Sequence, residues 1–264
     1  MTIFSITILI AGLLYVASVI FPCFKKSPDV KKRGTYILAL VGFIFHTVAM
    51  LVQYAPDMQS PVGNSYGLIL SIAWIIALLQ IAIPMFIKNG FFTMFPVAIL
   101  TLLPQACPMF SQVMGGSIKS TPSFAVVHGL LVALSYGALA VSAIFGGVYL
   151  KQKNSLRKKF HSSKEIPMPS LEMLEKGISV FIATSATTMF ASITAGIITA
   201  STLSHTPELL LKFTLGGAIF ALQLTLCFTA LMGYLRGAKL AKASITLFIF
   251  AIIMLIPIEL RMAI

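Results

Sequence analysis

The sequence has few charged residues, few cysteines and a single tryptophan. Only 10% of its 264 residues are Asp, Glu, Lys or Arg, whereas a soluble domain carries about 25%. With 58% hydrophobic residues, the chain could not cover its surface with charge in water. The same apolar content excludes a disordered chain, and three cysteines without a C-x-x-C pair exclude a disulfide scaffold and a zinc finger. We therefore expect an integral membrane protein.

Long apolar runs divide the chain. A transmembrane helix needs about 20 mostly apolar residues. On this rule we predict an all-α protein, a polytopic bundle of eight transmembrane helices that forms one domain over residues 1–264. The predicted spans are 3–23, 35–54, 67–87, 91–108, 122–150, 177–201, 213–233 and 244–260.

The positive charge lies between these runs. The net charge is +12, and 16 of the 19 basic residues follow the first, third, fifth and seventh span. The positive-inside rule places those segments in the cytoplasm and both termini outside. No basic residue precedes the first span, so we expect it to be retained and not cleaved as a signal peptide. These features predict a multi-pass protein of the bacterial cytoplasmic (inner) membrane, in contact with lipid and without a nucleic-acid partner.

Ionisable residues are nearly absent from the spans. No Asp, Glu, Lys or Arg lies in the middle of any predicted span, which argues against a proton relay, a voltage sensor or a carboxylate-coupled pump. The sequence also has no phosphate-binding loop, no Ser/His/Asp arrangement and no metalloprotease motif. With only short loops outside the membrane, we expect no enzyme activity.

Two histidines remain inside the spans, His46 in the second and His128 in the fifth. His46 lies eight residues from the outer boundary at Tyr54, and His128 lies six residues from Pro122. At about 1.5 Å per residue these depths are roughly 12 Å and 9 Å. Two imidazoles at similar depth could ligate one haem iron from opposite sides. Alternatively, each could simply form a hydrogen bond to a neighbouring helix.

Two further histidines are weaker candidates. His161 lies in the basic loop 151–176, and His205 lies in a short outer loop, where it could be a transient ligand. Near His128, Ser135 and Tyr136 share roughly its helix face. They could line a pocket or bond a ring nitrogen, but small residues such as Ser135 also serve close helix packing.

The segment 121–152 resembles the core helix of the cytochrome c assembly transmembrane family, which includes the CcsA, CcmC, HemX and YpjD proteins. His128, Leu134, Ser135 and Tyr136 match the family pattern. The resemblance implies that His128 is an axial haem ligand near the outer surface. His46 falls where YpjD-type members carry a histidine.

The chain also departs from that family. Its haem synthetases carry a tryptophan-rich outer loop, whereas the corresponding residues 201–216 contain no tryptophan, and Trp74 is the only one in the chain. An outer histidine expected at the end of the last span is missing as well. We therefore place the chain nearest to HemX and YpjD and expect no attachment of haem to apocytochrome.

These observations predict a haem-binding or haem-handling membrane protein that supports cytochrome c assembly or haem homeostasis, with His46 and His128 as iron ligands. The alternative is a cofactor-free, HemX-like regulator or scaffold that binds a haem-biosynthesis or cytochrome assembly protein through the loop 151–176. A small-solute transporter is disfavoured, because the sequence shows no internal repeat.

Overall fold

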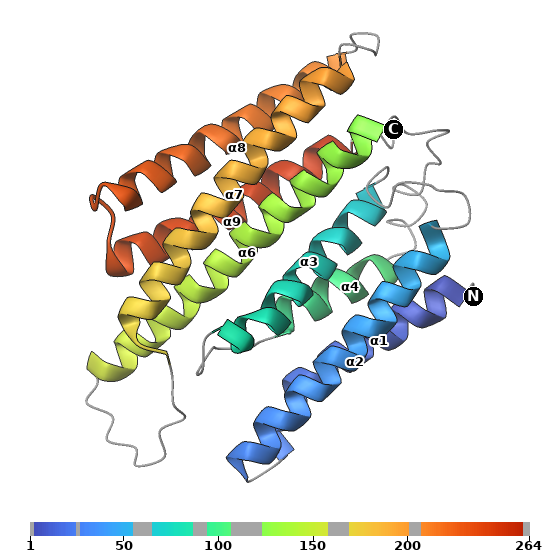
Figure 1. Ribbon diagram of the computed structural model, residues 1–264, viewed down its shortest axis with the longest axis vertical. Coiled ribbons are helices and arrows are strands. Elements are labelled where there is room, and N and C mark those ends of the chain that lie inside the picture. The colour runs from blue at the N-terminus through green and yellow to red at the C-terminus, as the bar shows by residue number, and fades with distance from the viewer. Residues whose placement is uncertain are drawn as a thin grey trace. The chain divides into compact units, whose positions relative to one another are not determined.

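The computed structural model describes residues 3–24, 27–54, 65–86, 94–106, 123–157, 169–200 and 207–260. Within these stretches all regular secondary structure is helical, as predicted (Figure 1). The helices are α1 (Ile3–Phe24), α2 (Pro28–Tyr54), α3 (Ser65–Phe86), α4 (Phe95–Ala106), α6 (Ser123–Arg157), α7 (Leu171–Ala200), α8 (Pro207–Leu231) and α9 (Gly237–Leu260).

Six of these helices are long and apolar enough to cross a membrane. The apolar segment of α3, Gly67–Ala82, is shorter, and α4 has 12 residues. Because lipid offers no hydrogen-bond partners, a spanning segment must satisfy its backbone internally, which a helix does. The candidate membrane spans within the described residues, by length and apolar composition, are Ile3–Pro22, Arg33–Val52, Val126–Arg157, Leu171–Ile198, Phe213–Leu231 and Gly237–Met254.

Several helix ends differ from the predicted spans. Helix α9 begins at Gly237 and not at residue 244, and within the described part of the fourth predicted span the helix is Phe95–Ala106. Helix α7 begins at Leu171, ahead of the predicted start of the sixth span at residue 177, and continues unbroken to Ala200. Hydropathy detects only the part of a helix inside lipid, whereas backbone hydrogen bonding continues into the polar region, where charged side chains are solvated.

The chain divides into two compact units, Met1–Thr121 and Pro122–Ile264. In the first unit, α1 packs along α2, and α4 contacts both α1 and α3. In the second, α6 packs along α7 and α9, and α8 contacts α7 and α9. That the two units act as one transmembrane domain stays a prediction.

Helices α8 and α9 are joined by a tight turn (Figure 1). Gly233 and Gly237 have φ of 75° and 56°, a left-handed conformation that side chains disfavour. The amide of Leu235 donates to the backbone oxygen of Thr229 at 3.1 Å, and that of Gly233 donates to Ala230 at 3.1 Å. A β-carbon at Gly237 would lie 2.8 Å from the Tyr149 hydroxyl oxygen, so the turn sits closely against α6.

Candidate functional site

His128 is half-buried on α6 and faces α7. Its Nδ1 lies 2.7 Å from the backbone oxygen of Ser192. A carbonyl oxygen can only accept, so Nδ1 carries the hydrogen and donates it. Because Nδ1 carries the hydrogen, Nε2 of the neutral ring carries the lone pair and is available to a ligand. The Ser192 hydroxyl completes the pairing, because it lies 3.0 Å from Nδ1 and donates to the backbone oxygen of His128 at 3.2 Å.

The ring of His128 also depends on a glycine. A β-carbon built on Gly196, one helical turn beyond Ser192, would lie 3.0 Å from both Cε1 and Nδ1 of His128. That separation is tighter than ordinary van der Waals contact. The absence of a side chain at Gly196 therefore leaves the space that the imidazole occupies against α7.

Three polar contacts between α6 and α7 follow one another along the two helices, and we term this row of contacts the polar seam. The contact of His128 with Ser192 is the first of them. Ser135 and Ser185 each donate to the other's backbone oxygen, at 2.9 and 2.8 Å. Ser142 donates to the backbone oxygen of Ile178 at 3.3 Å. On each helix these positions are seven residues apart, the repeat with which two helices keep one face together.

The polar seam decides between the roles considered for Ser135. Its hydroxyl bonds Ser185 on α7 and not the ring of His128, whose Nδ1 is held by Ser192. Ser135 is thus a packing residue, and Tyr136 beside it is buried. For His128 itself, the hydrogen bond to a neighbouring helix is present, and its predicted role as a haem ligand stays a prediction.

Gln223 of α8 reaches the middle of the polar seam. Its Nε2 donates to the hydroxyl of Ser185 at 3.0 Å and to that of Ser135 at 3.4 Å. Its Oε1 is buried and has no hydrogen-bond partner in the described part of the chain. Sequence reasoning missed Ser185, Ser192 and Gln223. The matching seven-residue spacings on two successive helices were a signal for the two serines.

His46 lies on α2 in the first unit and is fully buried. Its Nδ1 is 3.4 Å from the Tyr15 hydroxyl oxygen of α1, and the two rings meet edge to face with centroids 6.1 Å apart. Its Nε2 is buried and unpartnered among the described residues, although the backbone of Leu70 on α3 lies beside the ring. A buried imidazole nitrogen without a hydrogen bond is costly, so this atom marks a candidate site.

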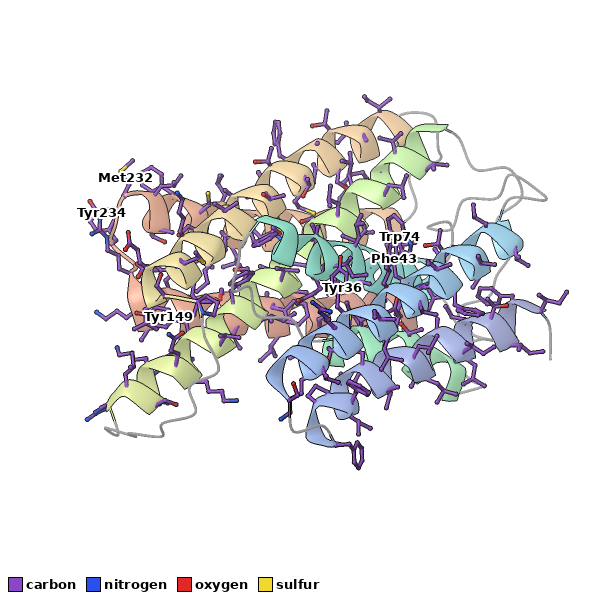
Figure 2. The ribbon with its side chains drawn as sticks, turned by 60° about the horizontal axis from the view of Figure 1, so that its bottom comes forward. Tyr36, Phe43, Trp74, Tyr149, Met232 and Tyr234 are labelled. Atoms are coloured by element: carbon purple, nitrogen blue, oxygen red, sulfur yellow. The ribbon has the colours of Figure 1, made fainter. Side chains whose placement is uncertain are left out.

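The helix carrying His46 is held in place by aromatic neighbours. Phe43 stacks on Trp74 of α3 with ring centroids 5.2 Å apart, as Figure 2 shows. The indole Nε1 of Trp74 donates to the Thr47 hydroxyl at 2.9 Å. These contacts fix the rotation of α2 against α3 and hence the direction in which His46 points.

The two candidate ligands thus lie in different compact units, His46 in the first and His128 in the second. The structure describes each unit by itself, so their approach to one iron stays a prediction. Among the described residues, no group of three or more His, Cys, Asp or Glu side chains could hold a metal ion. His161 and His205 lie outside the described residues, as do residues 158–168 of the loop 151–176, whose first seven residues belong to α6.

Comparison with known proteins finds one clear similarity. The chain is similar to protein HemX of Brevibacillus brevis, with 28% identity over 174 residues that cover 61% of this chain and 61% of the relative. The chain therefore spans less than two thirds of the length of that relative. No family model matches the chain, and no solved structure matches it. The similarity supports the HemX-like branch of the resemblance seen in the sequence.

Proposed function

We propose that this protein handles haem in the bacterial cytoplasmic membrane, in support of haem homeostasis or cytochrome c assembly, and that His128 is its principal iron ligand. The observation that carries the proposal is the 2.7 Å bond from Nδ1 of His128 to the backbone oxygen of Ser192. Histidines that ligate metals commonly donate their other ring nitrogen to a carbonyl, which fixes the tautomer and orients the ring. The similarity to HemX supports a haem-related role in the membrane.

His46 is the proposed second ligand. Its buried Nε2 lacks a hydrogen bond, and Tyr15 is the partner of its other nitrogen. If Nδ1 donates to the Tyr15 oxygen, Nε2 carries the lone pair that a metal needs. Bound haem would supply a redox-active iron, whereas the two histidines would hold and orient it. The lack of tryptophan in residues 201–216 favours storage, sensing or transfer of haem over its attachment to apocytochrome.

The test is haem titration of the full chain in mild detergent, followed by absorption in the oxidised and reduced states. We expect a Soret band and sharp reduced bands in the wild type. His128→Ala should lose the low-spin spectrum and regain it with added imidazole, a rescue that a purely structural role would not give. His161→Ala is the matched control, because it removes a histidine outside the predicted spans, and it should bind haem normally.

Substitution of His46 distinguishes two ligands from one. His46→Ala is expected to convert the spectrum to a five-coordinate form while haem remains bound through His128. A leucine variant, His46→Leu, fills more of the buried space and checks that the change does not come from a cavity. A wild-type protein that shows no haem bands at saturating haem would overturn the proposal.

The second candidate function is a cofactor-free, HemX-like regulator or scaffold. It is favoured by the polar seam, in which the ring of His128 already has a protein partner and so has a structural role without haem. The proposed contact is the basic segment 151–176. This function predicts that alanine at both histidines leaves activity in cells intact, whereas charge reversal at Lys151 and Lys153 removes it. Haem handling predicts the opposite result.

A further inference from the structure

The turn between α8 and α9 exposes large apolar side chains. Leu231, Met232 and Tyr234 are 70%, 58% and 77% exposed, and Figure 2 shows Met232 and Tyr234 at the outer edge of the bundle. The backbone hydrogen bonds of the turn and its close contact with Tyr149 hold these side chains in fixed positions. In a chain that spans a membrane, an apolar surface of this kind is open to contact with lipid.

Basic side chains accompany the apolar ones. Arg236 lies in the turn, and Lys239 and Lys242 follow on the first turns of α9, where all three are exposed. None of them has a carboxylate at ion-pair distance within the described part of the chain. The Glu175 carboxylate of α7 lies near the turn, with its Oε2 4.0 Å from the position that a β-carbon on Gly237 would take. With three basic residues and one nearby carboxylate, the turn combines a net positive charge with an apolar surface.

The depth of this surface follows from the lengths of the two helices. The apolar part of α8, Phe213–Leu231, has 19 residues and ends where the turn begins. At about 1.5 Å per residue it is close to 30 Å long, the thickness of the hydrocarbon layer. The apolar part of α9 begins at Gly237, directly after the turn. The turn therefore lies at the boundary between acyl chains and headgroups.

We propose that the α8–α9 turn binds the phosphodiester headgroup of an anionic membrane lipid. Arg236 and Lys239 contact the phosphate, while Met232 and Tyr234 contact the upper acyl chains. A guanidinium matches the geometry of phosphate oxygens, and tyrosine favours the membrane interface because one end of its ring is apolar and the other polar. A partner in the aqueous phase is disfavoured by depth, because the turn directly follows the apolar part of α8 and directly precedes that of α9.

The test is thermal unfolding of the full chain in mixed micelles that contain phosphatidylglycerol, phosphatidylcholine or neither. Phosphatidylglycerol should raise the midpoint by several degrees more than phosphatidylcholine. The attraction between a basic residue and an anionic membrane surface is large enough that the loss of two such residues weakens lipid binding about thirtyfold. Arg236→Gln with Lys239→Gln should therefore require about thirtyfold more phosphatidylglycerol for half of the shift.

The matched control removes two charges elsewhere. Lys151→Gln with Lys153→Gln changes two exposed residues of α6 and should shift the titration midpoint far less than the double variant of the turn does. Tyr234→Ser keeps the charge and should weaken the response to phosphatidylglycerol several-fold. Three results would overturn the proposal: equal effects of the two double variants, an equal shift with inorganic phosphate alone, or no preference for phosphatidylglycerol.

Discussion

Two adjacent glycines of α6 provide a sharp test of the packing in the second unit. Gly146 is buried and Gly147 is exposed. A β-carbon at Gly146 would lie 2.8 Å from the backbone oxygen of Ala241 and 2.9 Å from the hydroxyl oxygen of Ser244, both on α9. A β-carbon at Gly147 would have nothing within 4 Å. The same substitution at neighbouring positions should therefore have opposite effects.

The expected magnitudes follow from this difference. Replacing glycine by alanine inside a helix stabilises it by roughly 0.5–1 kcal/mol. At Gly147 nothing opposes that gain. At Gly146 the obstacle is a backbone carbonyl, which moves only if α9 moves, and overpacking of this kind costs typically 1–3 kcal/mol. The helix-propensity gain is common to both variants, so Gly146→Ala should be about 1–3 kcal/mol less stable than Gly147→Ala.

The assay is unfolding of each purified variant by sodium dodecyl sulfate in mixed micelles, followed by circular dichroism. Fluorescence is a useful second probe, because Trp74 is the only tryptophan and reports on the first unit alone. The dichroism transition should shift in opposite directions for the two variants. Equal stabilities, or a Gly147→Ala variant less stable than Gly146→Ala, would refute the close approach of α6 and α9.

Three further predictions concern the second unit. Gly196→Ala should displace the imidazole of His128 and break the hydrogen bond that orients it. The loss of roughly 1.4 kcal/mol of binding free energy would weaken haem binding about tenfold. Haem titration measures this affinity, and an unchanged value would contradict the prediction. Gln223→Leu should leave stability unchanged or raise it by about 1 kcal/mol. The substitution removes two weak hydrogen bonds, but it also removes a buried oxygen that has no partner, and the second effect offsets the first. A clear loss of stability in detergent unfolding would contradict this. Gly237→Ala should lower stability by about 1–2 kcal/mol, since alanine disfavours the positive φ there; wild-type stability in the same assay would contradict it.

Much of the helical architecture was predictable from the sequence, because an apolar run is a local property. Each of the eight predicted spans overlaps a helix of the structure, six of these helices are long and apolar enough to cross a membrane, and both candidate histidines lie inside helices. The helix ends were less predictable. Residues 237–243 contain two lysines and do not look like part of a span, yet α9 begins at Gly237 because its backbone hydrogen bonds do not depend on lipid.

The sequence by itself determined that this is a helical membrane protein, where its apolar helices lie and which two histidines lie within them. Only the tertiary structure decided the partners of those residues. His128 meets Ser192, which is 64 positions away, and Ser135 meets Ser185, which is 50 positions away. Seven-residue spacing shows that a helix has a polar stripe, but the register between two antiparallel helices depends on how closely their small residues let the backbones approach. Packing sets that distance, and it therefore decides which nitrogen of His128 is occupied and which is left for a ligand.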